Sequence, residues 1–134
     1  GPLAPLITRD CTLPLLTVLY ASREGGVAAR VAQEPPVVTV ADRLQEVSQD
    51  RSGPFIAALS KDPSARQSFL QALGGAEATC DFTDGIRMTL QDGRVVHIRP
   101  SGNAPELRLY VEAQDPEDAQ TLLTEGLALL RQNF

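Results

Sequence analysis

The chain has 134 residues, of which 43% are hydrophobic, so it is long enough for one globular domain with its own core and a fragment of a second. Its net charge of -5 argues against the broad basic surface that binds nucleic acids or anionic membranes, and an aromatic content of 4% provides few platforms for stacking bases. No apolar run approaches the roughly 20 residues of a membrane span, and no signal peptide is evident, so we expect neither nucleic acid nor membrane as a partner.

The first part of the chain favours two short helices without strands. Thr12 can cap a first helix that ends at Gly25 and Gly26, and residues 27–33 give a second helix. Pro35 and Pro36 can extend neither a helix nor a central strand, so they predict a hinge. The apolar stripe of the first helix consists of Leu15, Leu16, Leu19 and Tyr20.

No sheet lies near this stripe in the sequence, so we interpret residues 1–36 as a helical remnant of a preceding domain. An uncovered stripe of this kind is an exposed hydrophobic patch. Residues 3–34 are therefore candidates for self-association. Gly1-Pro2 resembles the scar that a tag-cleaving protease leaves.

Two cysteines, Cys11 and Cys80, lie far apart in the sequence and in apolar or strand-like surroundings. They form no Cys-x-x-Cys motif, and the chain has only one histidine to help bind a metal. We expect two buried free thiols in a reducing, cytoplasmic compartment and no metal site, with a disulfide or a metal site as the alternative.

The next part of the chain is predicted to contain one short strand and helical sequence. Residues 37–40 favour a strand, whereas the Ser-, Gln- and Asp-rich residues 45–53 are typical of a loop. Residues 54–73 favour a helix that Asp62-Pro63 can interrupt. Gly74-Gly75 would end it.

The remaining sequence predicts four strands and a final helix. The expected strands are residues 76–82, 86–90, 94–99 and 106–113, joined by turns at Thr83-Asp84-Gly85 and Asp92-Gly93 and by a longer loop. Asp115 can cap the last helix, with Pro116 at its first position. The fold class is therefore α+β, a four-stranded antiparallel sheet with helices packed on one face, within a domain spanning residues 37–134.

Two arginines are predicted to lie opposite each other on the uncovered sheet face. In the last two strands, apolar residues alternate with Arg99 and Arg108, and successive side chains of a strand point to opposite faces. If the apolar side chains face the helices, both arginines lie on the other face of the sheet. The simplest register pairs Ile98 with Leu109 and leaves the two arginine side-chain origins about 5 Å apart. Like charges at that spacing repel, and a bound anion would remove the conflict.

The loop between these strands contains residue types that bind phosphate. Ser101 supplies a hydroxyl, Gly102 permits a positive φ and an unobstructed N–H, and Asn103 adds an amide donor. Consecutive N–H groups in such a turn form an anion-binding nest, and two guanidinium groups beside it match the oxygens of a phosphate. The sequence therefore predicts a phosphate site here.

The alternative is an ordinary hairpin loop. In that case Arg99 would pair with Glu112 or Glu106, and Arg108 would be solvated. His97 is expected to be a strand-face residue and not a catalyst, and we predict no catalytic residue in this chain.

The sequence RPSGNAPELR at residues 99–108, with Thr83-Asp84-Gly85 before it and YVEA after it, resembles the C-terminal domain of the α-D-phosphohexomutases. It is most similar to the bacterial phosphomannomutase/phosphoglucomutase branch. The resemblance covers residues 76–131 well. Thr8-Arg9-Asp10 and the leucine-rich helix after it more loosely resemble the end of that family's third domain.

The resemblance implies a four-domain cytoplasmic isomerase that moves a phosphoryl group between O1 and O6 of a hexose. Such enzymes use a phosphoserine, Mg²⁺ and a hexose 1,6-bisphosphate, and their fourth domain closes the cleft and grips the substrate's phosphate. The residues that match the gripping loop are Arg99, Ser101, Gly102 and Asn103, with Arg108 as a supporting charge. Asn103 and Ala104 depart from the commonest loop, which has Thr and Glu there.

The phosphoserine, metal-binding and sugar-recognition loops of that family are missing from this sequence. We therefore interpret the chain as an inactive, phosphosugar-binding fragment whose partners are the other domains of the parent enzyme, which would hold the Mg²⁺. Its preference among hexose phosphates is not encoded here. The alternatives are a free-standing regulatory module that binds an anionic metabolite and, more weakly, a structural dimerisation domain.

Overall fold

A computed structural model describes residues 11–134 and divides the chain into two compact units, with the division between Pro36 and Val37. Gly1-Pro2 and Thr8-Arg9-Asp10, singled out in the sequence, lie outside the described residues. None of the helices within residues 11–134 is long and apolar enough to cross a membrane.

The N-terminal unit contains helices α1 (Thr12–Ala21) and α2 (Gly26–Val31). Helix α1 begins at Thr12, the residue predicted to be its cap, because Cys11 takes the N-cap position. Gly25 has a φ of 110°, a left-handed conformation in the turn after α1, and takes the N-cap position of α2. The predicted apolar stripe of α1 is exposed, and so is Cys11. The expectation of two buried thiols is therefore wrong for Cys11 and met only in part for Cys80, which is half-buried.

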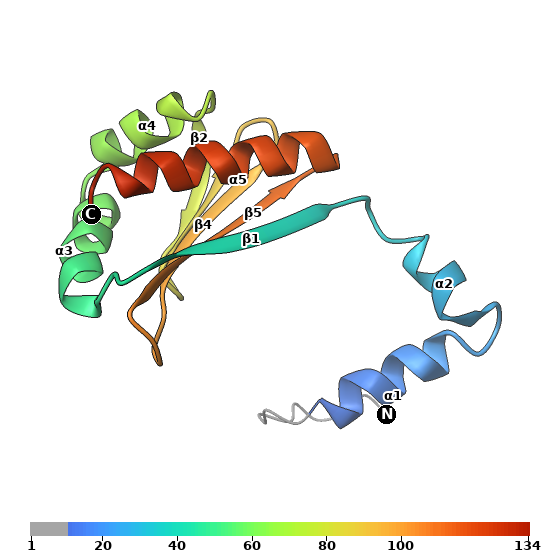
Figure 1. The fold of residues 1–134 in the computed structure, drawn as a ribbon. Coiled ribbons are helices and arrows are strands. Elements are labelled where there is room, and N and C mark those ends of the chain that lie inside the picture. The colour runs from blue at the N-terminus through green and yellow to red at the C-terminus, as the bar shows by residue number, and fades with distance from the viewer. Residues whose placement is uncertain (1–10) are drawn as a thin grey trace. The chain divides into compact units, whose positions relative to one another are not determined.

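The C-terminal unit is built on a five-stranded antiparallel sheet with the order β1-β5-β4-β3-β2 (Figure 1). Four strands match the predicted ones, namely β2 (Glu77–Asp81), β3 (Ile86–Leu90), β4 (Val95–Pro100) and β5 (Glu106–Ala113). The predicted number of four is wrong, because β1 (Val38–Gln45) continues past residue 40 and pairs with β5 along its whole length. As an edge strand, β1 tolerates the polar residues that obscured its alternation.

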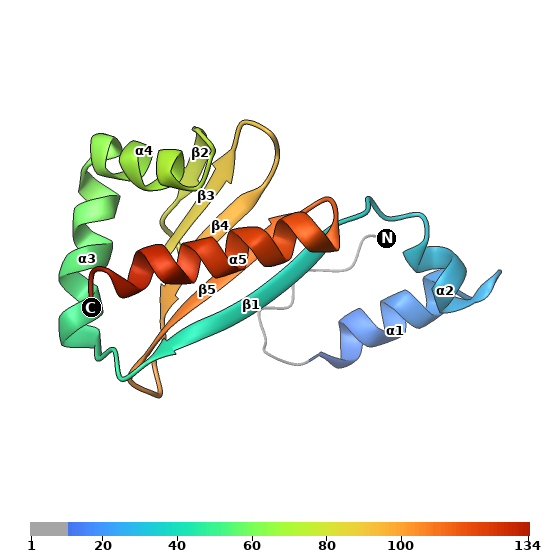
Figure 2. The same ribbon diagram turned by 45° about the horizontal axis from the view of Figure 1, so that its top comes forward.

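Three helices cover one face of this sheet, as predicted (Figures 1 and 2). They are α3 (Gln49–Lys61), α4 (Pro63–Ala72) and α5 (Pro116–Arg131). The break at Asp62-Pro63 is confirmed, since the Asp62 carboxylate accepts a hydrogen bond from the Ser64 N–H and caps α4. Asp115 caps α5 in the same way, as predicted, through the Asp118 N–H.

The predicted loop at residues 45–53 is wrong, because α3 begins at Gln49 and includes Gly53 and Pro54. Ser52 explains how polar sequence forms a helix here. Its side chain is fully buried, and its hydroxyl donates to the carbonyl of Ser48 at 3.0 Å. Burial and this local bond outweigh the turn preference of the residue types.

The core lies between the sheet and the three helices. Its sheet residues alternate along the strands, and the central ones have no exposed surface: Ile86, Met88, Val96, Ile98, Leu107, Leu109 and Val111. The helices contribute Leu59, Phe69, Leu70, Leu122, Leu127 and Leu130. The residues between the buried ones therefore form the opposite face, which no helix of this unit covers.

A nearly buried ion pair joins α4 to the edge strand β2. The guanidinium of Arg66 donates to both carboxylate oxygens of Glu77, at 2.6 and 3.1 Å, and to the carbonyl of Leu59 at 2.9 Å. The hydrogen bond to Glu77, together with its charge, raises the pKa of Arg66. The side chains are only 8% and 22% exposed, so losing one partner leaves the other poorly solvated.

We expect Arg66→Ala to lower the free energy of unfolding by about 2 to 3 kcal/mol, somewhat less than for a fully buried pair because Glu77 keeps some contact with water. Urea unfolding followed by circular dichroism measures this. The control is Arg30→Ala, which removes the exposed i,i+4 pair with Glu34 and should change stability by less than about 0.5 kcal/mol. Equal effects of the two variants would contradict the role given to Arg66.

Candidate anion-binding site

Three arginines form a row across the open face of the sheet. Arg99 on β4 lies directly opposite Arg108 on β5, as predicted, and Ile98 lies opposite Leu109. On the other side of β5, Arg108 lies opposite Arg43 of β1. The side chains of Arg43, Arg99 and Arg108 are 51%, 40% and 38% exposed, so all three remain accessible from water.

Two carboxylates balance part of this positive charge. Asp84 forms an ion pair with Arg99 at 3.1 Å, and Glu106 forms ion pairs with Arg43 at 3.1 Å and with Arg108 at 3.4 Å. Hydrogen bonds to Tyr110 and then to Glu106 raise the pKa of Arg108. The Arg99–Asp84 pair is exposed and contributes little, so an incoming anion can compete with Asp84 for Arg99.

The alternative prediction, an ordinary hairpin loop, is wrong about the partners of both arginines. Arg99 pairs with neither Glu112 nor Glu106, because Glu112 accepts from Arg87 at 3.1 and 3.2 Å. Arg108 is not simply solvated, since it is held by Glu106. The sequence suggested only a turn-forming role for Asp84, and its contact with Arg99 was missed.

The loop between β4 and β5 is held at several points. Ser101 is 3% exposed, its N–H donates to the carbonyl of Glu106 at 2.9 Å, and its hydroxyl accepts from the Asn103 N–H at 3.4 Å. No acceptor within residues 11–134 takes a hydrogen bond from the N–H groups of Gly102 and Ala104. These two donors are available to an anion.

Gly102 does not use the left-handed conformation expected of it, because its φ is not among the positive values of the described residues. A Cβ atom added to it would have nothing within 4 Å. The glycine therefore leaves open space above the loop backbone, which a ligand can occupy.

The segment between β1 and α3 and the first residue of α3 support the loop from beside it (Figure 1). The Val47 N–H donates to the carbonyl of Pro105, and the Gln49 side chain donates to the carbonyl of Ser101, both at 3.0 Å. No sequence pattern indicated these contacts, because residues 45–53 were predicted to be a loop.

The turn between β2 and β3 holds Asp84 beside Arg99. Gly85 has a φ of 80°, and a Cβ atom there would lie 2.3 Å from the carbonyl oxygen of Ile98 and 3.0 Å from the Cα of Arg99. Next to it, the His97 ring Nε2 lies 2.6 Å from the carbonyl oxygen of Asp84. The turn therefore packs directly on the β4 backbone at the position of Arg99.

His97 is a strand-face residue, as predicted, with its ring centroid 5.5 Å from that of Tyr110. Its contact with the carbonyl oxygen of Asp84 holds the turn between β2 and β3. No cluster of three or more His, Cys, Asp or Glu side chains within residues 11–134 could hold a metal ion.

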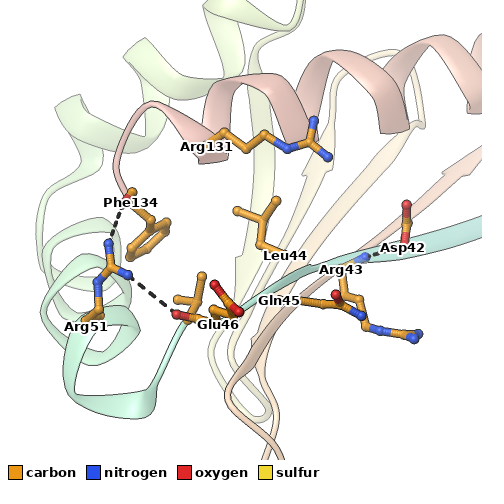
Figure 3. A pocket seen from close by; sticks show the side chains of 9 residues that line it. Asp42, Arg43, Leu44, Gln45, Glu46, Arg51, Arg131 and Phe134 are labelled. Atoms are coloured by element: carbon orange, nitrogen blue, oxygen red, sulfur yellow. Dashed lines mark hydrogen bonds between the residues drawn. The ribbon is translucent and has the colours of Figure 1, made fainter.

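A pocket beside the edge strand β1 includes Arg43 of the row in its lining but none of the predicted loop residues. It has a volume of about 470 Å³ and is lined partly by Leu44, Glu46, Arg51, Arg131 and Phe134 (Figure 3). Arg51 is already bound there to the carbonyl oxygens of Phe134 and Glu46. We therefore assign the candidate site to the row of arginines and its loop, where donors remain unpaired.

The geometry defines an α+β domain that presents cationic side chains and free backbone donors at one end of an open sheet face. The family described as phosphoglucomutase/phosphomannomutase, C-terminal domain, has a model that matches residues 27–128. The chain therefore belongs to this family, which confirms the resemblance seen in the sequence.

Individual relatives agree with this membership. The chain is 43% identical to a phosphomannomutase of Sinorhizobium fredii over 134 residues and 34% identical to one of Salmonella muenchen over 132 residues. These alignments cover 98% and 96% of this chain but 28% and 27% of the relatives. A phosphoglucosamine mutase of Methanocaldococcus jannaschii is 45% identical over 52 residues, which is 39% of this chain and 11% of that protein.

The contact of Gly85 with β4 leads to a matched pair of variants. Gly85→Ala and Gly93→Ala both place a side chain at a positive φ, but only Gly85 has backbone within 3 Å of the added atom. We expect Gly93→Ala to cost about 1 kcal/mol of stability and Gly85→Ala about 2 to 4 kcal/mol, because the second also forces β4 to move. Urea unfolding measures both losses.

The backbone amide of Arg99 should shift in the NMR spectrum of Gly85→Ala and stay in place in Gly93→Ala. If the two variants lose the same stability, the close approach of the turn to β4 does not constrain the site.

Proposed function

We propose that this chain is the C-terminal domain of a phosphohexomutase that interconverts hexose 6-phosphate and hexose 1-phosphate, and that it binds the phosphate of the substrate. The observation that carries the proposal is the opposed pair Arg99 and Arg108 beside a loop with free N–H groups. Family membership supports the class of ligand. The two phosphomannomutases align along nearly the whole chain, which favours a mannose phosphate.

The residues of this chain would act by binding and positioning. Arg99 and Arg108 donate pairs of hydrogen bonds to phosphate oxygens, a geometry for which guanidinium groups are suited. Ser101, Gly102 and Asn103 complete the site with a hydroxyl and donors of the loop. With the phosphate held, the domain closes the cleft of the parent enzyme and excludes water from it.

The chemistry itself belongs to other parts of the parent enzyme. Mg²⁺ would neutralise charge on the transferring phosphoryl group there, and hexose 1,6-bisphosphate would act as activator. Since residues 11–134 contain no cluster suited to a metal, we place its ligands in the other domains, in the cytoplasmic compartment that the resemblance implies.

The N-terminal unit is best explained as the end of the preceding domain. The exposed residues of α1 would be covered by that domain in the parent, and would otherwise favour self-association of residues 3–34. Nearly the whole chain aligns with little more than a quarter of the length of these relatives. This favours the interpretation as one domain of a longer enzyme over that of a free-standing regulatory module.

The first test is phosphate binding by the chain alone. We expect mannose 6-phosphate and inorganic phosphate to bind with a Kd of about 1 mM, since a few charge-assisted hydrogen bonds must offset the cost of association. Amide shifts in an NMR titration should centre on residues 99–108. Arg99→Ala should weaken binding at least about tenfold. Arg99→Lys should give an intermediate affinity, because it keeps the positive charge but not the paired N–H donors of the guanidinium.

Arg131→Ala is the control, because it removes the same charge from α5 on the other side of the sheet and should leave the Kd unchanged. Binding should weaken as pH falls below about 6, where phosphate loses a negative charge while the arginines keep theirs. If amides 99–108 stay still at tens of millimolar phosphate, the loop is a hairpin connection only.

A second test concerns catalysis. Because the phosphoserine and metal loops are missing from the sequence, we expect the chain alone to convert no mannose 1-phosphate to mannose 6-phosphate, with or without Mg²⁺ and bisphosphate. A coupled assay for the 6-phosphate measures this. Turnover that rises in proportion to the purified chain would refute the assignment of chemistry to the other domains.

A further inference from the structure

The row of arginines contains one member that the loop motif does not include. Arg43 lies on the edge strand β1, directly opposite Arg108. Figure 3 shows its side chain leaving β1 away from α5, whereas Leu44 and Asp42 extend towards α5. The guanidinium of Arg43 therefore shares the open face with Arg108.

A pocket of about 300 Å³ opens this part of the face. It is lined by Ala41, Asp42, Arg43, Arg108 and Tyr110. The register places the small Ala41 opposite Tyr110, so that no long side chain of β1 covers the ring or the adjacent guanidinium. Arg108 thus remains reachable from the side of β1.

Glu106 is the group that both of these arginines contact. Its Oε1 forms an ion pair with Nε of Arg43 at 3.1 Å, and its Oε2 accepts a hydrogen bond from Nη2 of Arg108 at 3.4 Å. Glu106 is only 18% exposed, so water solvates its charge poorly and it requires a cationic partner. Without Arg43, Arg108 would be the cation that remains to neutralise Glu106.

A phosphate and Glu106 therefore compete for Arg108. Arg43 reduces the competition, because it supplies Glu106 with a second and closer cation. The three arginines of the row share two carboxylates, Glu106 and Asp84, which leaves one positive charge for a ligand.

We propose that Arg43 is a positioning residue of the phosphate site, which neutralises Glu106 and so releases Arg108 to the ligand. This role rests on the proposed phosphate binding. It predicts that Arg43 affects affinity through Glu106, without donating to the phosphate itself.

The test measures inorganic phosphate binding by NMR titration of the whole chain. Arg43→Gln, which keeps most of the stem of the side chain, should weaken binding about three- to fivefold, the range of one exposed ion pair. Arg43→Lys should bind as the parent does. The double variant Arg43→Gln with Glu106→Gln should return to within twofold of the parent, because the competing charge is gone.

Two further measurements separate this role from a general effect of charge. Arg87→Ala removes an arginine of the same face that is bound to Glu112, and should change the Kd less than twofold. The side-chain Nε–H signal of Arg108 should shift with phosphate in the parent and less in Arg43→Gln. An equal loss of affinity in Arg87→Ala and Arg43→Gln, or no rescue by Glu106→Gln, overturns the proposal.

The outcomes distinguish the two levels of inference. If the parent binds phosphate and Arg99→Ala does not, but Arg43→Gln binds as the parent does, only the role of Arg43 is wrong. If the parent binds no phosphate, the proposed function fails and the role of Arg43 fails with it.

Discussion

Burial of one sheet face beneath three helices is the constraint on which the rest of the domain depends. Ile98 and Leu109 have no exposed surface, and their pairing fixes the register of β4 and β5. A slip by one residue would turn every apolar side chain of a strand to the wrong face, at a large cost in free energy. The core therefore enforces the close approach of Arg99 and Arg108, which is unfavourable in itself.

Sequence patterns predicted those parts of the fold in which local preference and burial agree. The last three strands and α5 follow from strict alternation, a turn glycine and a capped apolar face. Prediction failed at β1 and at the start of α3, where polar residues are tolerated by an exposed edge or are satisfied locally, as Ser52 is by Ser48. If the alternation had been followed past Asp42 to Leu44, the rest of β1 would have been predicted.

The site likewise contains residues that strand alternation predicts and contacts that it does not. Parity placed Arg99 and Arg108 correctly because both belong to strands with clear alternation. Arg43 was missed because its strand was ended too early, and the contact of Asp84 depends on how a turn packs against a distant strand, which no spacing in the sequence encodes. The role expected of Gly102 was wrong in conformation, because open space and not a left-handed backbone distinguishes that position.

In the proposed phosphate site, the carboxylates of Asp84 and Glu106 have a kinetic consequence. A ligand that leaves this row does not expose three bare cations, because each arginine has a carboxylate within 3.4 Å to which it can return. Departure of the ligand is then an exchange of partners, and the barrier to dissociation is lower than for an unbalanced cluster of arginines. Under the proposed function the ligand is a phosphorylated sugar that leaves once in each catalytic cycle, so a site of this composition favours fast release over tight retention.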